Sequence, residues 1–244
     1  MFIKLLTLRL KKLFLIILRP KLLKVFLKYR VMAAIEHDIL FKKDIKTLVD
    51  IGANRGQFSL AALSDRIKIY AFEPLPKPSK IFMEIFKKNT NVKFFEYAIG
   101  DFKGEVEMHV SQKDDSSSIL EIASLQTEHF PGTEEVGLQK INVAPLKNFI
   151  SPEEILSPSM LKLDVQGFEL EALKGCFEFF EYFDYIYCEC SFIKLYKDQS
   201  LASDIITYLK SYDYHISGIF NMQYDHSGNS IQADFFFTKY KSKD

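Results

Sequence analysis

The sequence lacks several features that would assign it to common protein classes. Its 244 residues include only three cysteines, Cys176, Cys188 and Cys190, which are too few and too clustered for a disulfide framework and suit a reducing cytosol. Zinc sites need four ligands at turn-like spacings, so Cys188 and Cys190, two apart on one predicted strand, are interpreted as core residues. Internal repeats and low-complexity linkers are also lacking, and the length fits one large domain or two small ones.

Long apolar runs are missing from the N-terminus as well. The longest run in residues 1–30 covers six residues, 13–18, too short for a signal peptide or for the ~20 residues of a membrane span. This stretch carries nine Lys and Arg residues and no acid. Its leucines and cations recur at helical spacing on either side of Pro20, which predicts two short amphipathic helices within a basic segment, residues 1–45. Two interpretations are open: a peripheral anchor on an anionic inner membrane surface, or a cap packed on the domain.

The chain has no excess of charge of either sign. It carries 32 basic and 32 acidic residues, which argues against nucleic acid as a general partner. The balance hides an asymmetry, because residues 31–244 carry 23 basic against 32 acidic residues once the nine N-terminal cations are subtracted. We expect a cytoplasmic protein, peripheral to the inner membrane if the anchor interpretation holds.

The stretch Thr47–Ser59 (TLVDIGANRGQFS) organises the rest of the chain. An apolar run ends in Asp50, and a turn containing Gly52, Ala53, Asn54 and Gly56 leads into a helical pattern. A buried strand that feeds a tight turn and then a helix leaves backbone N–H groups free at one place. Such a crevice, at the carboxyl end of a parallel strand, binds nucleotide-like ligands.

The two common phosphate-binding loops are both absent. The turn does not contain G-x-G-x-x-G, and no G-x-x-x-x-G-K-[ST] follows, so a nicotinamide-dependent oxidoreductase is the weaker interpretation. A carboxylate at Asp50 would repel a pyrophosphate but accept hydrogen bonds from an ammonium group. S-adenosylmethionine has such an ammonium group, and its adenosyl moiety carries no phosphate.

Two further acids follow predicted strands. Glu73 comes 21 residues after Gly52 and is followed by Pro74, which is the spacing expected of an acid that accepts both ribose hydroxyls. Asp101 follows the run 92–97 and the Ala98–Gly100 turn, and we expect it beside the adenine. Asp50, Glu73 and Asp101 thus predict one cofactor site at successive strand ends.

Strands and helices alternate from residue 46 to residue 240. This order predicts an α/β domain with a mostly parallel sheet and helices on both faces. The closing runs 214–220 and 231–238 predict a mixed sheet with an antiparallel edge. The polar stretch 111–137 is expected to be irregular, either a lid or acceptor platform over the crevice or a surface loop.

Three acids are candidate catalytic residues. Asp164 ends the predicted strand 160–163, Glu169 lies in the first turn of the next helix, and Glu189 lies within the apolar strand 185–192. For Glu169 a favourable interaction with the helix N-terminus is an equal alternative. His109 and His129 are alternative bases. In another interpretation, Asp164 and Glu189 are ligands of a divalent cation that polarises the acceptor hydroxyl.

The segments VDIGANRGQFS, AFEP, AIGD, PLKNF, LKLDVQGFELEALKG and YIYCECS, in this order, resemble the FkbM family of S-adenosylmethionine-dependent methyltransferases. The resemblance covers Thr47 to Thr238 and implies a class I, Rossmann-like methyltransferase domain with a seven-stranded sheet. It implies cofactor contacts at Asp50, Gly52, Asn54, Gly56, Glu73 and Asp101, and a second signature at Asp164, Gly167 and Glu169. The chain departs from the family at Gln166, where Glu is common, so metal dependence is open.

The resemblance implies methylation of a hydroxyl oxygen, with a sugar, a glycolipid or a related small molecule as acceptor. A membrane-surface nucleotide-binding protein with degenerate catalysis is the alternative from another class. The sequence does not identify the acceptor or the oligomeric state.

Overall fold

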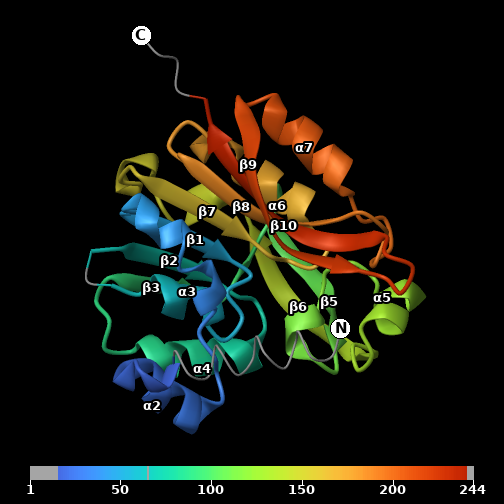
Figure 1. Cartoon of the computed structure of the whole chain (residues 1–244), viewed down its shortest axis with the longest axis horizontal. Coiled ribbons are helices and arrows are strands. Elements are labelled where there is room, and N and C mark those ends of the chain that lie inside the picture. The colour runs from blue at the N-terminus through green and yellow to red at the C-terminus, as the bar shows by residue number, and fades with distance from the viewer. Residues whose placement is uncertain (1–15, 65, 241–244) are drawn as a thin grey trace.

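The computed structural model describes residues 16–64 and 66–240 and is built around one seven-stranded sheet (Figure 1). The strands lie in the order β3-β2-β1-β7-β8-β10-β9. Their bounds are β1 Thr47–Ile51, β2 Lys68–Phe72, β3 Val92–Phe95, β7 Ser159–Leu163, β8 Tyr185–Ser191, β9 Tyr214–Tyr224 and β10 Ser230–Lys239. The predicted mostly parallel, mixed sheet is confirmed.

The strand that opposes the others is β10. It pairs antiparallel with both β8 and β9, whereas β3, β2, β1, β7 and β8 pair in parallel. The antiparallel strand therefore lies one place inside the edge, and the edge strand β9 has the direction of the parallel set. The chain adds β2 and β3 on one side of β1 and then places β7 on the other side, so the strand order reverses between β1 and β7. In doubly wound sheets a crevice opens at the carboxyl ends of the two strands at such a point.

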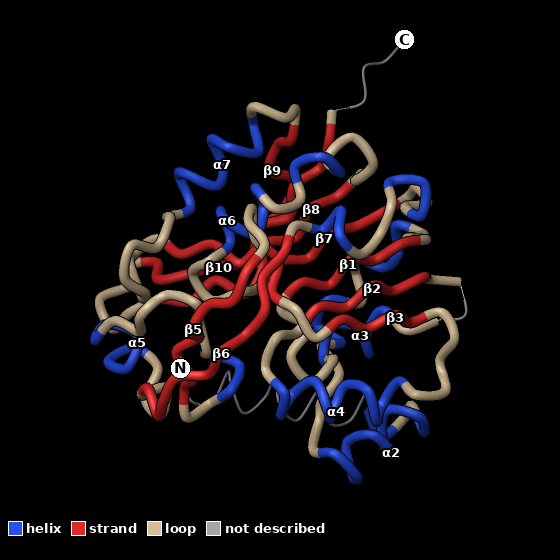
Figure 2. Tube along the Cα trace, turned by 180° about the vertical axis from the view of Figure 1, so that it is seen from behind, coloured by secondary structure: helices blue, strands red, loops and turns tan. Residues whose placement is uncertain are grey.

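Helices cover both faces of the sheet, as predicted (Figures 1 and 2). The short helix α3 and the longer α4 pack with one apolar cluster, and α6 and α7 pack with the other. Their bounds are α3 Gln57–Ala62, α4 Pro76–Phe86, α6 Glu169–Lys174 and α7 Ala202–Lys210. All three cysteines are buried and free in the second cluster, which confirms the interpretation of Cys188 and Cys190 as core residues.

A second, three-stranded sheet was not predicted. It has the order β4-β6-β5, with β4 Ala98–Ile99, β5 Gly104–Ser111 and β6 Glu135–Ala144. The expected strand 92–97 therefore ends at Phe95. The stretch 111–137 is also less irregular than expected, because it contains helix α5 Ser124–His129 and the start of β6.

Short 3-10 helices connect many of these elements. They are η1 Ile35–His37, η2 Leu40–Lys43, η3 Asp114–Ser116, η4 Leu146–Asn148, η5 Pro152–Glu154 and η6 Phe177–Phe179.

The described part of the N-terminal segment packs on the domain. Helix α2 Pro20–Tyr29 begins at a proline, which suits the first helical turn, and its apolar side contacts the cluster that also contains α3 and α4. Val31 and Leu40 are buried in that same cluster. From residue 31 onward, the N-terminal segment, residues 1–45, thus shares the core of the domain. Within the described residues no helix is long and apolar enough to cross a membrane; the first predicted helix lies largely outside them.

Candidate active site

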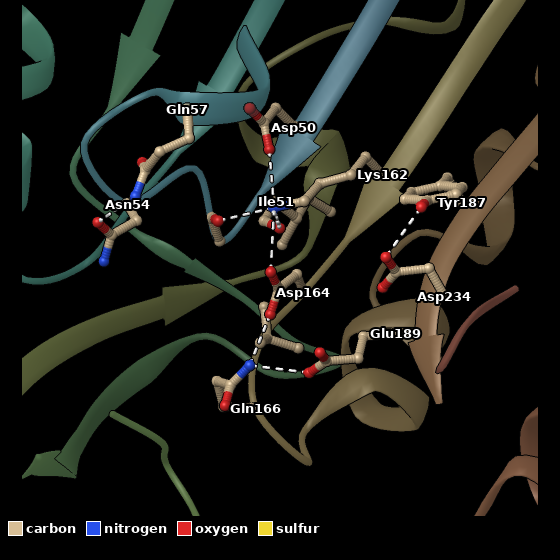
Figure 3. A network of polar contacts seen from close by, with 12 residues as sticks. Asp50, Ile51, Asn54, Gln57, Lys162, Asp164, Gln166, Tyr187, Glu189 and Asp234 are labelled. Carbon is tan, nitrogen blue, oxygen red and sulfur yellow. Dashed lines mark hydrogen bonds and ion pairs between the residues drawn. The ribbon is translucent and has the colours of Figure 1, made fainter. Parts of the chain in front are cut away.

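A cavity of about 230 Å³ lies at the carboxyl ends of β1, β2 and β7 and extends to Tyr187 of β8. The turn after β1, the tip of β2, the loop after β7 and the second sheet line it, together with η3 from the stretch 111–137. Figure 3 shows the polar side chains that meet there from segments distant in the sequence.

The glycine turn after β1 is shaped by close contacts on both sides. Gly52 has φ +73°, and a Cβ atom there would lie 1.8 Å from the backbone oxygen of Asp164. Gly56 has φ +91° and faces helix α4, where a Cβ atom would lie 2.5 Å from the Phe86 ring. Asn54 has φ +46° and faces the cavity. The first glycine therefore lets β7 approach the turn, whereas Gly56 serves helix packing and does not line the cavity.

Glu73 ties the tip of β2 to this turn. Its Oε2 accepts a hydrogen bond from the Asn54 backbone N–H at 3.0 Å, and its Oε1 accepts one from the Leu75 N–H at 2.8 Å. The side chain is 5% exposed and lines the cavity beside Pro74 and Ala53. Burial raises the pKa of Glu73 to about 7, with the two backbone donors opposing that rise.

Asp50 is placed differently from the prediction. It is fully buried and lies behind the turn, where its Oδ2 accepts a hydrogen bond from Ser59 Oγ at 2.7 Å. Its Oδ1 lies 3.1 Å from Lys162 Nζ, so the ammonium group that the carboxylate binds is supplied by the protein itself.

Lys162 could not be identified from the sequence because its partner belongs to a strand more than a hundred residues away. Its ammonium group donates to the Gly52 carbonyl at 2.8 Å and lies 4.0 Å from Asp164. Burial alone would lower the pKa of Lys162, but the carboxylates of Asp50 and Asp164 outweigh it and the pKa is raised. A charged lysine therefore fixes the junction of β1 and β7, and it also lines the cavity.

Asp164 and Glu189 are brought together by Gln166. The Gln166 amide donates to Asp164 Oδ1 at 2.7 Å and to Glu189 Oε2 at 2.8 Å (Figure 3). Its Oε1 accepts a hydrogen bond from the Tyr196 hydroxyl at 2.8 Å. The Asp164 side chain is 43% exposed and lines the cavity. Glu189 does not line it, and its other oxygen accepts a hydrogen bond from Gln232 at 2.9 Å.

Burial and the nearby Asp164 carboxylate raise the pKa of Glu189 well above its ordinary value. Of the two acids, Asp164 is thus the one that faces the cavity, and Glu189 supports it through Gln166.

Two predicted residues lie elsewhere. Glu169 is 2% exposed, and its Oε1 accepts hydrogen bonds from the backbone N–H groups of Val165 and Gly167 at 3.1 and 3.0 Å. It organises the loop after β7, and burial raises its pKa to about 7. Asp101 is exposed and does not line the cavity. The Ala98–Ile99 strand joins the second sheet, and the chain carries Asp101 away from the tip of β3.

The loop histidines also lie outside the cavity. His109 pairs with Glu135 at 2.6 Å on the outer side of the second sheet, and His129 ends helix α5. Instead, the stretch 111–137 contributes Asp114 and Asp115. Asp114 forms an ion pair with Arg55 of the glycine turn at 2.5 Å, which holds this stretch over the cavity.

The donor set does not fit a metal ion. Within residues 16–64 and 66–240, no three His, Cys, Asp or Glu side chains are arranged to hold one. The group between Asp164 and Glu189 is an amide NH₂, which donates hydrogen bonds and cannot ligate a cation through the nitrogen.

A match to a protein-family model identifies the family of this chain. Residues 50–216, more than half of the chain, match the model of the methyltransferase FkbM domain. The chain belongs to the FkbM methyltransferase family. This FkbM protein is an S-adenosylmethionine-dependent methyltransferase, and the resemblance found in the sequence is confirmed.

The FkbM chain is 26% identical over 182 residues to the 2-O-methyltransferase NoeI of Sinorhizobium fredii, a match that covers 71% of this chain and 75% of that protein. Among solved structures, magnesium protoporphyrin IX methyltransferase from Synechocystis, with bound S-adenosylmethionine, is 10% identical, with TM-score 0.46 and coverage of 84% and 76%. TehB from Haemophilus influenzae is 13% identical, with TM-score 0.47 and coverage of 88% and 65%.

Proposed function

We propose that this FkbM protein transfers a methyl group from S-adenosylmethionine to a hydroxyl oxygen of a sugar, a glycan or a related small molecule. The observation that carries the proposal is the exposed carboxylate of Asp164, which faces the cavity directly beside the Gly52–Asn54 turn. The likeness to a 2-O-methyltransferase supports oxygen as the acceptor atom. Membership of a methyltransferase family favours this function over a nicotinamide-dependent oxidoreductase and over a degenerate binding protein.

The residues around the turn fit S-adenosylmethionine. Gln57 lines the cavity beside Asn54, and its buried Oε1 has no hydrogen-bond partner among the described residues, so it offers an acceptor for an ammonium or hydroxyl group. Glu73 provides the acceptor expected for the ribose hydroxyls, and Ala53 and Pro74 provide apolar walls. We assign Gly52, Ala53, Asn54, Glu73 and Pro74 to the cofactor site, with Asp50 and Gly56 supporting the turn from behind.

The bound cofactor supplies a methyl carbon activated by a sulfonium centre. The protein has to hold the acceptor oxygen in line with that carbon, and alignment of this kind can lower a barrier by several kcal/mol. Asp164 has one oxygen fixed by the Gln166 amide, and its Oδ2 lies 4.0 Å from Lys162 Nζ. Asp164 Oδ2 is thus positioned to accept the proton of the acceptor hydroxyl, and Gln166 and Lys162 fix its orientation.

We also propose that helix α2 contacts an anionic membrane surface. Lys21, Lys24 and Lys28 border a groove of about 780 Å³ between α2 and α4, to which Lys87 and Lys88, directly after α4, add further positive charge. Leu27, 62% exposed, extends from the same helix. Such a surface would keep the enzyme near a lipid-linked acceptor. Sedimentation with vesicles of phosphatidylcholine alone and with 30% phosphatidylserine tests this: we expect binding only to the anionic vesicles, and loss of it in a Lys21→Glu, Lys24→Glu, Lys28→Glu variant.

Two measurements test the main proposal. Calorimetry should detect binding of S-adenosylhomocysteine and no binding of NADH. With labelled S-adenosylmethionine and extracted cell glycans, the wild type should transfer methyl groups, and mass spectrometry should locate them on oxygen. Asp164→Asn should lower kcat by about 10²–10⁴-fold, the usual contribution of a general base. Its affinity for S-adenosylhomocysteine should stay unchanged.

The matched control is Asp44→Asn, an equivalent change at an exposed residue outside the cavity, which should retain full activity. Turnover near the wild-type rate in Asp164→Asn would remove this residue from the chemistry.

A further inference from the structure

The cavity extends beyond the proposed cofactor residues to a second polar wall. Tyr187 on β8, Asp234 on β10 and His37 on η1 line this part. In the strand order, β10 lies three places from β1, which corresponds to about 14 Å along the sheet edge. Asp234 is therefore separate from the turn around Gly52, whereas His37 and Tyr187 pack against Phe58 of α3. Figure 3 shows Tyr187 and Asp234 on the other side of Lys162 from Asn54 and Gln57.

The three side chains form a directed hydrogen-bond chain. The Tyr187 hydroxyl donates to Asp234 Oδ2 at 2.9 Å, and His37 Nδ1 lies 3.0 Å from the Tyr187 oxygen. Because the single hydroxyl proton is used toward Asp234, the Nδ1–H tautomer of His37 donates to the tyrosine. Burial and the carboxylate of Asp234 raise the pKa of Tyr187, which keeps its proton in place.

Asp234 has one oxygen to spare. Its Oδ2 accepts hydrogen bonds from Tyr187 and from Asn221 Nδ2, the latter at 2.6 Å. No donor in the described part of the chain forms a hydrogen bond with Oδ1. Because this oxygen is not among the fully buried atoms that have no partner, it is accessible. Asp234 lines the cavity, so its Oδ1 is an acceptor open to a ligand there.

The charged surroundings favour a neutral ligand with hydroxyl groups. Asp234 shares the cavity with the carboxylate of Asp164 and with the ammonium group of Lys162, which is already bound by Asp50. Burial raises the pKa of Asp234 to about 6, and Asp164 adds to this rise while Asn221, Tyr187 and Lys162 oppose it. An anionic ligand would meet two carboxylates, whereas a polyhydroxylated ligand can donate to both.

We propose that Asp234, oriented by Tyr187 and His37, binds a second hydroxyl group of a polyhydroxylated acceptor while Asp164 receives the hydroxyl to be methylated. The acceptor class is thus a diol or polyol, such as a sugar ring, rather than an isolated alcohol or a phenol. This inference rests on the proposed function. It also gives the segment before β1 a role in the site, because His37 comes from it.

The experiment measures methyl transfer to a panel of methyl glycosides and then to deoxy analogues of the best one, each lacking one hydroxyl. The wild type should lose about 10- to 100-fold in kcat/KM for the analogue that lacks the hydroxyl bound by Asp234, as expected for a hydrogen bond to a charged group. In Asp234→Ala this difference between glycoside and analogue should vanish. Tyr187→Phe should raise KM for the glycoside more than it lowers kcat.

Asp225→Ala is the control, since Asp225 lies in the turn of the same β9–β10 hairpin and does not line the cavity. It should keep the wild-type discrimination. Binding of S-adenosylhomocysteine shows that each variant is folded, and Asp234→Asn replaces Asp234→Ala if the latter does not bind it.

The inference is overturned if the Asp234 variants keep the wild-type loss for every deoxy analogue, or if the wild type binds S-adenosylhomocysteine but methylates no glycoside. Failure of the wild type to bind S-adenosylhomocysteine would instead refute the proposed function itself.

Discussion

The two ends of the cavity are held together by different kinds of bond. At the β1–β2 end, backbone N–H groups of Asn54 and Leu75 donate to the buried carboxylate of Glu73. At the β7–β8 end, Glu169 likewise accepts from backbone N–H groups, but the Asp164 carboxylate that faces the cavity is held by the side chain of Gln166, which also donates to Glu189. The cavity-facing carboxylate of the first end is thus fixed by the backbone path, whereas that of the second depends on individual side chains. One end therefore suits an unchanging cofactor, and the other can be altered by single substitutions to suit an acceptor.

The largest effect is expected at the backbone-defined end. Gly52→Ala would place a Cβ atom 1.8 Å from the Asp164 carbonyl oxygen, so β1 and β7 would have to separate. We expect a loss of about 5 kcal/mol in the free energy of unfolding, enough to unfold a domain of ordinary stability. Soluble yield and urea unfolding measure it.

Gly228→Ala is the matched control, because Gly228 has φ +86° but no atom within 4 Å of the added carbon. It should cost about 1 kcal/mol, the price of backbone strain alone. Equal losses in the two variants would mean that the close approach at Gly52 is unimportant.

The junction between the two ends is expected to come next. Lys162→Met leaves the buried carboxylate of Asp50 with Ser59 as its remaining partner. Removing one member of a buried ion pair costs about 3–5 kcal/mol, which urea unfolding at pH 7 would detect. In the double variant Asp50→Asn, Lys162→Met, much of that loss should be recovered, and a purely additive loss would argue against the pairing.

Replacing Glu169 should change the free energy of unfolding in a pH-dependent way, by an amount similar to or smaller than that expected for Lys162→Met. Its pKa is raised from 4.5 to about 7, so the folded state binds its proton more tightly than the unfolded state. The stability that it contributes is therefore complete below about pH 4.5 and lost as the pH rises through about 7. Relative to the wild type, Glu169→Gln should gain up to about 3 kcal/mol between pH 4.5 and pH 8. A pH-independent difference in urea unfolding would contradict this.

The smallest effect is expected from removing one hydrogen bond, that between Tyr196 and Gln166, at the β7–β8 end of the cavity. Tyr196→Phe removes the hydroxyl that donates to Gln166 Oε1 and lies 3.1 Å from the Ser116 carbonyl. We expect a loss of about 1 kcal/mol in the free energy of unfolding and a weaker hold on Asp164, seen as a lower kcat. Affinity for S-adenosylhomocysteine should not change, because that end of the cavity is held by backbone bonds. A large loss of affinity would show that the two ends are coupled.

Much of the fold could be predicted because it is encoded locally. The apolar run before Asp50, the turn glycines and the alternation of strands and helices predicted the mixed parallel sheet and the place of its crevice. The second sheet could not be predicted, because the pairing of β5 with β6 joins residues on either side of a long connection. Nothing local distinguishes a strand of the main sheet from a strand of another.

The candidate site was predicted in part for the same reason. Glu73 and Asp164 line the cavity because each follows its own strand, and a strand end is visible in the sequence. Asp101 and Glu169 also follow strands, yet the chain turns Asp101 into the solvent and folds Glu169 back onto its own loop. The direction of a side chain after a strand depends on the contacts of the loop, which the residue pattern does not contain.

The sequence by itself determined where the backbone turns, since positive φ values and buried strands depend on residue type and near neighbours. Only the tertiary structure decided which charges meet. The partner of Asp50 is Lys162 on a strand far along the chain, and His37, Tyr187 and Asp234 come from three distant segments. Electrostatic and hydrogen-bond partners are set by distance in space, and the packing of the sheet brings these side chains together.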